Sequence, residues 1–496
     1  MNGLAPVSNK ARPLASLLDG LACDVPGVDI AGVAIDSRRV KPGSLFLAYR
    51  GTQSHGLDHV EAAVAAGAVA VAWDDAHPPA LDVPSVRVEA LASRASRIAG
   101  RFYDEPSQKL FVAGVTGTDG KTSCAWLLSQ ALELLGARCG YIGTLGFGFA
   151  DDLAEATHTT PDPVAVQDWL ARLAAADASA VAFEVSSHAL DQHRVDGVAF
   201  DVAVLTQLGR DHLDYHASLE AYAAAKQRLF AFDGLSSAVL NGDDAYGREW
   251  LAALAADVTP IAYGCGDMAA LADNYVRIES VATRVDGLSL TLDTSWGRAV
   301  IDSVLVGRFN AMNLAAVLAV LLARGVDFDA ATAVLAQLTT VPGRMQRVDT
   351  RDDQPMVVVD YAHTPGALAH AIAAVREHAA ARVLCVFGCG GDRDAGKRPL
   401  MGAAAEAADA VWLTDDNPRS ESPAAIVAAI SAGMQGNTPV TIEHDRAAAI
   451  ADAIHAARPG DVVLIAGKGH ETTQQIGATR RIFDDRLAAH DALEAL

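Results

Sequence analysis

A short glycine-rich segment near residue 120 has the composition of a loop that binds phosphate groups. It lies between an apolar run, Leu110–Val115, and a helical stretch, Ser123–Leu135, that Gly136 ends. Glycines let backbone N–H groups converge on phosphate oxygens, and the N-terminus of a helix favours negative charge. In such a loop the lysine reaches the β- and γ-phosphates, and the threonine hydroxyl binds Mg²⁺. The residues of this loop are Gly117, Thr118, Asp119, Gly120, Lys121, Thr122 and Ser123.

The loop follows the short pattern GxxGK[ST] and departs from the strict Walker spacing, because Val115 stands where that spacing requires glycine. An ordinary glycine-rich turn is therefore the alternative to a nucleotide site. Further polar motifs favour the nucleotide site. Glu184 begins one of them and His212 lies in another, and together with the loop they suit metal-assisted phosphoryl transfer with both residues as Mg²⁺ ligands. Taken alone, Glu184 would indicate only a carboxylate at the end of a strand, and His212 only a histidine that caps a helix.

The elements that must position these residues are short apolar runs alternating with longer Ala/Leu-rich stretches. This alternation predicts α/β domains with mainly parallel sheets, whose ligands bind beyond the carboxyl ends of the strands. The apolar runs are Leu110–Val115, Ala180–Val185, Val202–Thr206, Met356–Val359, Val383–Phe387, Ala410–Thr414 and Val462–Ala466.

Two stretches rich in turn residues, Tyr103–Ser107 and Val341–Arg344, divide the chain. They predict three domains, at residues 1–107, 108–341 and 342–496, as suits a chain of 496 residues. Alternation on either side of Asp286-Gly287 predicts a hairpin inside the middle domain.

Charge and hydropathy exclude several classes of protein. A net charge of −22 argues against binding nucleic acid or anionic membranes. No apolar run reaches the roughly 18 residues of a membrane helix, and no secretory pattern opens the chain. We therefore expect a cytoplasmic protein with no membrane insertion. Cys385 and Cys389 have no second pair at zinc spacing, so we expect buried small side chains there and no metal site.

The order of the motifs resembles that of the Mur ligases, which build the peptide stem of bacterial peptidoglycan. The resemblance extends over essentially the whole chain. It implies an N-terminal domain for the UDP end of the substrate, a central ATP-binding domain, and a Rossmann-like C-terminal domain for the incoming amino acid. The motifs that carry it are Gly117–Thr122, Glu184–His188, Arg210–His212, Gly307–Asn310 and Gly343–Met345.

The reaction implied by this resemblance begins with transfer of the ATP γ-phosphate to a carboxylate. An amine then attacks the acyl phosphate, giving an amide, ADP and phosphate. Lys121 and two Mg²⁺ ions are expected to stabilise the charge on the transferring group. The resemblance further implies catalytic roles for Glu184, His212 and Lys226. It also implies that Lys226 is carbamylated by CO₂ (N6-carboxylysine) and that Thr122, Glu184, His212 and the Lys226 carbamate bind metal. Asn310, Arg344 and Asp360 are implied contacts of the nucleotide.

Two positions depart from the family pattern. Asp119 stands where most members have asparagine, and His158 stands where many close relatives also have asparagine. A carboxylate beside a triphosphate is unfavourable unless it points away. The residues implied to bind a UDP-N-acetylmuramoyl-L-alanyl-D-glutamate substrate are Ile35, Ser37, Thr52, Gln53, Ser54, His158, Thr159, Thr160, Ser186, Gln192 and Arg194.

The motif Asp416-Asn417-Pro418-Arg419 resembles the signature of the family branch that adds meso-2,6-diaminopimelate. This amino acid is lysine with a second carboxylate at its far end. An arginine can bind that carboxylate with two hydrogen bonds. With lysine as the substrate, the arginine has no carboxylate to pair with. Without the resemblance, the same four residues indicate only a surface turn. The residues implied to bind diaminopimelate are Arg393, Asp416, Asn417, Pro418, Arg419, Gly467 and Glu471.

Three alternatives remain at this stage. A folylpolyglutamate synthetase-like enzyme shares the loop and the modified lysine, but has no use for Ser37 and its neighbours. A P-loop kinase or regulatory NTPase is motivated by Gly117–Thr122 alone. A catalytically inactive binding protein is disfavoured because Lys121, Glu184, His212 and Lys226 are all present. We expect a monomer.

Overall fold

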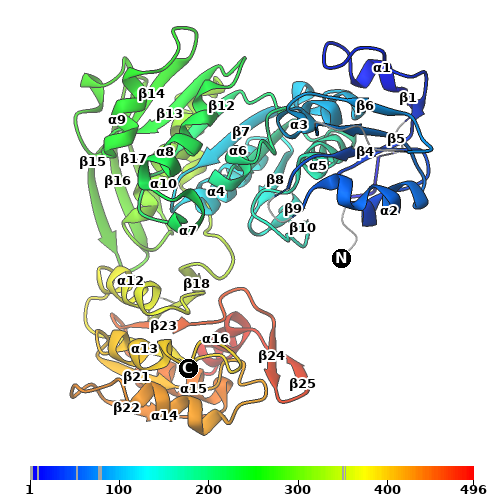
Figure 1. Cartoon of the computed structure of the whole chain (residues 1–496). Helices are drawn as coiled ribbons and strands as arrows, with labels where there is room; N and C mark the ends of the chain where they lie inside the picture. The colour runs from blue at the N-terminus through cyan, green and yellow to red at the C-terminus, as the bar shows by residue number, and fades with distance from the viewer. Residues whose placement is uncertain (1–3, 8–9, 52–53, 76–80, 349–350, 352) are drawn as a thin grey trace. The chain divides into compact units, whose positions relative to one another are not determined.

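A computed structural model of the chain describes residues 4–7, 10–51, 54–75, 81–348, 351 and 353–496. The chain divides into two compact units (Figure 1). Unit 1 contains residues 1–277 and 315–331, and unit 2 contains residues 278–314 and 332–496. Thr52 and Gln53, two of the predicted substrate residues, lie outside the described residues.

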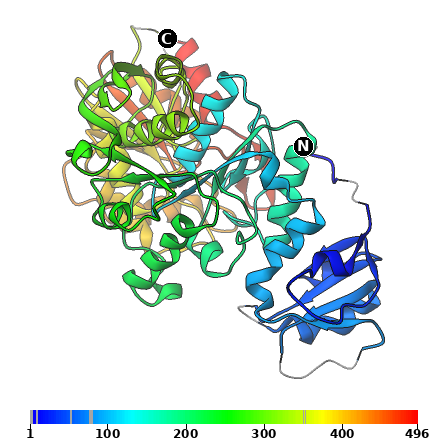
Figure 2. The same ribbon diagram turned by 90° about the horizontal axis from the view of Figure 1, so that it is seen from above.

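Unit 1 begins with a small parallel sheet in the order β3-β4-β5-β6. The helix α3 packs against this sheet and lies beside α5 of the following segment (Figure 2). The first elements are β1 (Arg12–Pro13), α1 (Leu14–Leu17), β2 (Asp29–Ile30), β3 (Gly32–Ala34), η1 (Ser37–Arg39), β4 (Ser44–Ala48), η2 (Gly56–His59), α2 (Val60–Ala65), β5 (Ala68–Trp73), β6 (Ser85–Arg87), α3 (Leu91–Phe102) and η3 (Pro106–Lys109).

An eleven-stranded sheet begins in unit 1 with the strand order β10-β9-β8-β11-β7-β12-β13-β14-β15, parallel from β8 to β15, and β15 has residues in both units. Its elements are β7 (Phe111–Thr116), α4 (Lys121–Leu134), β8 (Cys139–Gly143), β9 (Gly146–Phe149), β10 (Asp152–Ala154), α5 (Pro163–Ala175), β11 (Ala180–Glu184), α6 (Ser187–Asp191), β12 (Val202–Leu205), α7 (Leu213–His216), α8 (Leu219–Gln227), η4 (Arg228–Ala231), β13 (Ser237–Asn241), α9 (Ala245–Ala252), β14 (Thr259–Gly264), η5 (Met268–Ala270) and β15 (Asn274–Arg284).

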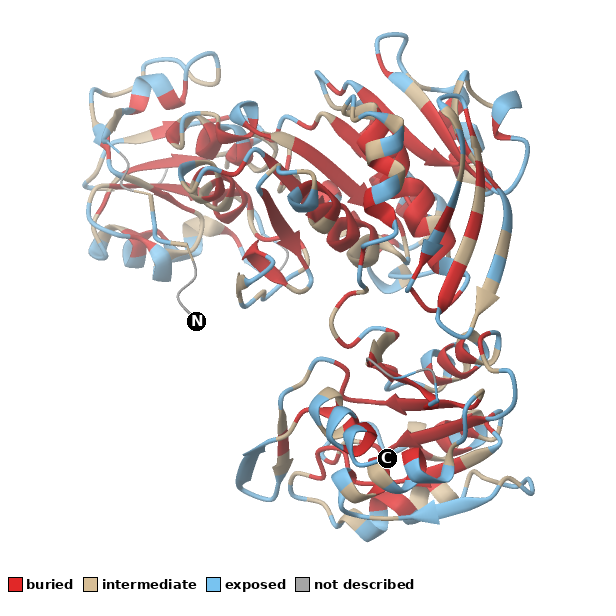
Figure 3. Cartoon of the chain, turned by 180° about the vertical axis from the view of Figure 1, so that it is seen from behind, coloured by how far each residue is buried: buried red, intermediate tan, exposed pale blue. Residues whose placement is uncertain are grey.

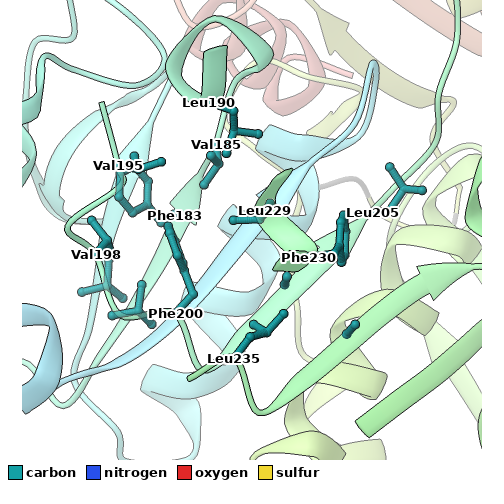
Figure 4. Packing of buried hydrophobic residues seen from close by; sticks show 14 of the residues in the cluster. Phe183, Val185, Leu190, Val195, Val198, Phe200, Leu205, Leu229, Phe230 and Leu235 are labelled. Carbon is teal, nitrogen blue, oxygen red and sulfur yellow. The ribbon is translucent and has the colours of Figure 1, made fainter. Parts of the chain in front are cut away.

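The core of this sheet is made by apolar side chains that lie between the strands and the helices covering them (Figure 4). Phe183 of β11 packs on Phe200, with ring centroids 5.9 Å apart. Gly114 of β7 allows this packing, because a Cβ there would lie 2.8 Å from the Phe200 ring. The central strands are buried along their length while their connecting loops are exposed (Figure 3). The polar residues at the carboxyl ends of the strands are partly buried, and Glu184 and Thr206 are among the buried ones.

Unit 2 contains a six-stranded sheet in the order β18-β19-β23-β20-β21-β22, in which only the β18–β19 pair is antiparallel. The helices α10 and α11 have residues in both units. The elements are β16 (Gly287–Thr294), β17 (Gly297–Ser303), α10 (Phe309–Ala323), α11 (Phe328–Leu335), β18 (Gln346–Val348), β19 (Met356–Asp360), α12 (Pro365–Arg376), β20 (Val383–Phe387), α13 (Lys397–Ala405), β21 (Ala410–Leu413), α14 (Pro423–Ser431), β22 (Val440–Ile442), α15 (Arg446–Ala456), β23 (Val462–Ala466), β24 (Thr473–Ile476), β25 (Thr479–Ile482) and α16 (Asp485–Glu494).

The predicted α/β class is confirmed, and the predicted strands agree with the observed ones to within a residue at each end. The helix after the phosphate loop begins at Lys121, two residues earlier than predicted. The predicted hairpin is present, with Asp286 in the turn between β15 and β16. Cys385 and Cys389 are both buried, as expected. No helix among the described residues is long and apolar enough to cross a membrane.

Candidate active site

The phosphate loop connects β7 to α4 and is held open by two glycines in the left-handed region, Gly117 at φ +148° and Gly120 at φ +83°. A Cβ at Gly117 would lie 1.8 Å from the Thr206 hydroxyl, so no other residue fits there without displacing β12. The backbone N–H of Thr118 donates to the Gln207 carbonyl at 2.7 Å. The loop is thus fixed against the end of the neighbouring strand before any ligand binds.

Glu184 lies at the carboxyl end of β11, opposite Val115 of β7, and is fully buried. The Thr122 hydroxyl donates to its Oε2 at 2.8 Å, and the Thr144 backbone N–H donates to its Oε1 at 2.9 Å. The Tyr141 hydroxyl also donates to Oε1. Burial and the adjacent Glu184 carboxylate hold the pKa of Tyr141 well above its usual range. The predicted residues Thr122 and Glu184 are therefore brought together, and their oxygens are of the kind that Mg²⁺ prefers.

Two lysines converge on the same loop carbonyl. The Nζ atoms of Lys121 and Lys226 donate to the carbonyl oxygen of Gly117, at 2.9 and 2.7 Å. Lys226 is 1% exposed, and its Nζ lies 4.4 Å from the centre of the Tyr222 ring. Desolvation, followed by the positive charge of Lys121, lowers the pKa of Lys226 to about 6. Lys226 thus presents a neutral, nucleophilic amine at neutral pH.

His212 belongs to a cluster of rings beside the loop. It has φ +52°, and its ring lies 4.8 Å from that of His188 and 6.2 Å from that of Tyr222. The Tyr222 hydroxyl is 3.1 Å from the Thr118 hydroxyl, which connects the cluster to the loop. Desolvation, aided by the charge of neighbouring His212, lowers the pKa of His188.

Asp119, the departure in the loop, accepts a hydrogen bond from Gln207 Nε2 at 2.8 Å. Its side chain is exposed, and its backbone carbonyl accepts from the Thr206 hydroxyl at 2.6 Å. The carboxylate is therefore directed towards Gln207, on the strand-end segment that follows β12.

A cavity of about 870 Å³ opens between the N-terminal sheet and the larger sheet within unit 1. A second one of about 640 Å³ shares part of its lining and extends to His188 and His212. Arg194 donates to the Thr160 carbonyl at 2.8 Å and to Gln192 Oε1 at 2.6 Å, so the predicted residues support one another. The predicted residues that line one or both cavities are Ile35, His158, Thr159, Thr160, Ser186, Gln192 and Arg194.

Ser37 and Ser54 line neither of these two cavities. Ser37 begins the 3₁₀ turn η1, and the Ser54 hydroxyl is 3.1 Å from His59 Nε2. The cavity that contains Ile35 instead includes Arg39, which pairs with Asp162 at 2.7 Å. Sequence reasoning passed over Arg39, and only its proximity to Asp162, 123 residues away, distinguishes it from other surface arginines.

In unit 2, Asp360 ends β19 and is buried. It accepts from the Met345 N–H at 2.7 Å and from the Ala362 N–H at 2.8 Å, and burial raises its pKa. The guanidinium of Arg344 lies 4.8 Å from the centre of the Tyr361 ring. Asn310 donates to the Val306 carbonyl at 2.8 Å, which holds its amide in place at the start of α10.

The motif Asp416–Arg419 follows β21 and is buried up to Pro418. Arg419 has φ +53°, a costly conformation for an arginine, and its Nη1 donates to the Gly391 carbonyl at 2.7 Å. A Cβ at Gly390 would lie 3.0 Å from Arg419 Nη1 and 3.7 Å from Arg393 Cγ. Arg393 is exposed, and the two predicted arginines flank the same glycine.

The other predicted residues of this site come from the turn after β23. Asn417 Nδ2 donates to Glu471 Oε2 at 3.0 Å. Gly467 has φ +117°, and a Cβ there would lie 3.0 Å from Asp416 Oδ2. Burial raises the pKa of Asp416. Asp416, Asn417, Gly467 and Glu471 therefore form one cluster. Gln475, whose N–H donates to Asn417 Oδ1 and whose carbonyl accepts from the Arg419 N–H, connects Arg419 to it.

Several residues that the sequence did not single out belong to these sites. Tyr141 and Thr144 hold Glu184, and Tyr222 holds Lys226 and Thr118. Tyr141 and Thr144 lie in and directly after β8, the strand beside β11, and Tyr222 lies one helical turn before Lys226. These positions are the features of the sequence that could have identified the three residues. Among the residues described, no three His, Cys, Asp or Glu side chains gather as a metal site.

Three family models match successive segments of the chain: the Mur ligase family catalytic domain at residues 29–103, the Mur ligase middle domain at 115–321, and the Mur ligase glutamate ligase domain at 343–469. Each segment lies within one of the three predicted domains, whose exact limits stay a prediction.

Similar proteins match over nearly the whole chain. The UDP-N-acetylmuramoyl-L-alanyl-D-glutamate–2,6-diaminopimelate ligase of Ectopseudomonas mendocina is 52% identical and covers 95% of this chain and 96% of its own length. A solved structure with the same name is 35% identical, with a TM-score of 0.78, over 98% of this chain and 99% of that one. A MurF ligase of Thermotoga maritima in complex with ADP shares the fold at 18% identity and a TM-score of 0.57, over 93% of this chain and 97% of that one.

The low pKa of Lys226 predicts a specific dependence of stability on pH. The pKa is about 6 in the folded protein and about 10.5 when unfolded, so between these values the unfolded state binds one more proton. The cost of burying Lys226 is therefore complete below pH 6 and disappears as the pH rises towards 10.5. The free energy of unfolding of the wild type, minus that of Lys226→Met, should increase from pH 7 to pH 9, by at most about 1.4 kcal/mol per pH unit.

Urea denaturation at pH 7, 8 and 9 in buffers freed of bicarbonate measures this difference. Lys109→Met is the matched control, because Lys109 is exposed and pairs with Asp104 at the surface. Its difference from the wild type should not change over this range. An equally flat difference for Lys226→Met would contradict the lowered pKa.

Proposed function

The chain belongs to the Mur ligase family, and we propose that it adds meso-2,6-diaminopimelate to UDP-N-acetylmuramoyl-L-alanyl-D-glutamate at the expense of ATP. It is an ATP-dependent, amide-forming ligase of peptidoglycan precursor synthesis. The observation that carries the choice of amino acid is the cluster of Arg419, Asn417 and Glu471. Asn417 holds the Glu471 carboxylate. Gln475 links Asn417 to the backbone of Arg419. The guanidinium of Arg419 and the carboxylate of Glu471 suit the carboxylate and the ammonium at the far end of diaminopimelate.

The reaction forms two bonds in sequence. A free carboxylate of the D-glutamyl residue takes the γ-phosphoryl group of ATP, which gives an acyl phosphate and ADP. The amine of diaminopimelate then attacks the acyl carbon, phosphate leaves, and the nitrogen loses a proton. Both steps spread negative charge over phosphate oxygens, so preorganised cationic and N–H donors accelerate them.

The residues of unit 1 suit the phosphate side of this reaction. We assign the ATP phosphates to the N–H groups of residues 117–123 and to Lys121. In the structure Lys121 Nζ lies on the carbonyls of Gly117 and Thr118, at 2.9 and 2.8 Å. We assign Asn310, Arg344 and Asp360 to the rest of the nucleotide. The ring of Tyr361, which lies against the Arg344 guanidinium, offers a flat apolar surface at this site.

We assign Thr122, Glu184, His212 and Lys226 to two Mg²⁺ ions, which would neutralise the phosphoryl oxygens. Thr122 and Glu184 already hold each other's oxygens at 2.8 Å, a hard-oxygen pair that fits Mg²⁺. Lys226 fits only as a carbamate, because an amine is a poor ligand for this ion. Its neutral amine at physiological pH is the form that reacts with CO₂, and the carbamate would add an oxygen ligand to those of Thr122 and Glu184.

The two cavities of unit 1 suit the UDP-linked substrate. We assign the larger to its anionic end, near Arg39, and the smaller to its peptide end, near Arg194 and His212. Ser37, Thr52, Gln53 and Ser54 remain assigned to the same substrate. His158 lines both cavities, so a contact there does not require the asparagine of its relatives. The domain limits 1–107, 108–341 and 342–496, the monomeric state and the cytoplasmic location also remain proposals.

The direct test is phosphate release with ATP, Mg²⁺ and UDP-N-acetylmuramoyl-L-alanyl-D-glutamate. We expect release that depends on the amino acid and is far faster with meso-diaminopimelate than with lysine, because lysine leaves Arg419 unpaired. Mass spectrometry should find the UDP-tripeptide. Equal rates with both amino acids would refute the assigned specificity. Release that needs neither amino acid nor UDP-dipeptide would favour the regulatory NTPase.

Arg419→Ala should lower kcat/KM for diaminopimelate roughly 30-fold or more, which corresponds to the loss of about 2–5 kcal/mol that is typical of losing one partner of a charge pair in a binding site. The KM for ATP should change less than about two-fold, because Arg419 is assigned only to the amino acid. Arg376→Ala is the control. It likewise removes an arginine from an ion pair, the one with Asp409 at the end of α12, but at a position assigned to no substrate. A similar fall in affinity for ATP and diaminopimelate would show that Arg419 has another role.

The carbamate can be observed directly. Wild-type protein equilibrated with ¹³C-bicarbonate and Mg²⁺ in a sealed tube should show one ¹³C carbamate resonance. Lys226→Arg should lack this resonance, and Lys109→Arg should keep it, because Lys226 is buried with a pKa of about 6 whereas Lys109 is exposed. A resonance that survives in Lys226→Arg would place the modification on another lysine.

A further inference from the structure

Lys468 is a fully buried lysine at the end of β23, and no role has been assigned to it so far. Its Nζ donates to the Thr473 carbonyl at 2.7 Å and to Glu471 Oε2 at 3.1 Å. It also lies 3.5 Å from Asn417 Oδ1 and 3.9 Å from Asp416 Oδ1. A buried ammonium is tolerated only when its N–H groups are satisfied in this way. Three of these four partners belong to the cluster assigned to diaminopimelate.

The contacts of Lys468 determine how Glu471 is turned. Oε2 of Glu471 accepts from both Lys468 and Asn417, at 3.1 and 3.0 Å. Oε1 has no hydrogen-bond partner within the part of the chain that the structure describes. Oε2 is thus held in place, and Oε1 can accept a hydrogen bond from a bound ligand. Without Lys468, Glu471 would be held by a single neutral amide.

Lys468 also connects the cluster to the hairpin of β24 and β25. Thr473, which accepts from Lys468, is the first residue of β24. Two residues on, the Gln475 N–H donates to Asn417 Oδ1 at 2.9 Å, and the Gln475 carbonyl accepts from the Arg419 N–H at 3.2 Å. The hairpin therefore holds Arg419 in its left-handed conformation, and Lys468 fixes the first residue of the hairpin.

We propose that Lys468 is a positioning residue that sets the selectivity for an amino acid with a distal ammonium group, by aiming Oε1 of Glu471 at that ammonium. This inference rests on the proposed function. Lys468 itself does not touch the amino acid. Its charge balances that of Glu471, and its hydrogen bonds fix the side-chain rotation of Glu471.

The alternative is that Lys468 only stabilises the fold of unit 2. The two roles differ in which substrate property they affect. A loss of fold stability lowers activity with every amino acid by the same factor. A misdirected Glu471 lowers activity only with amino acids that carry the distal ammonium.

The test compares meso-diaminopimelate with 2-aminopimelate, which lacks only the distal amino group. The wild type should prefer diaminopimelate. Lys468→Met, which keeps the length and apolar stem, should reduce this preference in kcat/KM about ten-fold or more, with the KM for ATP nearly unchanged. Arg382→Met is the matched control, because Arg382 pairs with buried Asp461 immediately before β23, at the opposite end of the strand from Lys468. It should lower the melting temperature but keep the preference.

An equal fall with both amino acids in Lys468→Met would overturn the inference and leave the proposed function intact. A wild type that accepts no diaminopimelate would overturn the proposed function itself. If Lys468→Met does not fold, Lys468→Gln keeps a hydrogen-bond donor and tests the same ratio.

A double-mutant cycle gives an independent readout. If Lys468 acts through Glu471, the double variant Lys468→Met/Glu471→Gln should prefer diaminopimelate no less than Glu471→Gln alone. If the loss of preference in the double variant equals the product of the losses in the two single variants, Lys468 does not act through Glu471.

Discussion

The buried carboxylate of Glu184 is the contact on which the catalytic half of unit 1 depends. It sits at 0% exposure, where an unpaired charge is not tolerated, and its oxygens accept from Thr122, Tyr141 and Thr144. These donors come from the phosphate loop and from the end of β8. A single acidic side chain of β11 is therefore hydrogen-bonded both to the phosphate loop and to the end of β8.

Parallel strands make this arrangement possible. In unit 1, β8, β11, β7 and β12 all end at one edge of the sheet, so Thr144, Glu184, the loop and Thr206 meet there. In unit 2, β19, β23, β20 and β21 do the same, and Asp360 lies directly opposite Ala466 in the register. Residues as far apart in the chain as Asp360 and Ala466 become neighbours because each one lies at the end of a strand.

The sequence alone predicted the strand ends, and with them the loop, Glu184 and the Asp416–Arg419 turn, since each follows an apolar run that is easily recognised. It could not predict the burial of Lys226 or Lys468. Both depend on what surrounds a side chain in three dimensions: the ring of Tyr222 and the carbonyl of Gly117 in one case, and the carbonyl of Thr473 in the other. The direction of Asp119 was equally open, because it is decided by Gln207, 88 residues further along. Ser37 and Ser54 were predicted to contact the substrate, but neither lines the two cavities of unit 1. Their motifs lie near cavity-lining residues in the sequence, and this alone does not determine where their side chains lie.

The two lysines that share the Gly117 carbonyl have a consequence beyond the site itself. Burial lowers the pKa of both lysines, and the positive charge of Lys121 lowers that of Lys226 further, to about 6. On the role proposed for Lys226, the gene encodes only part of that ligand, and the rest comes from dissolved inorganic carbon. The occupancy of the metal site then varies with the gas in equilibrium with the solution. Two preparations of identical sequence, one degassed and one not, would be chemically different proteins.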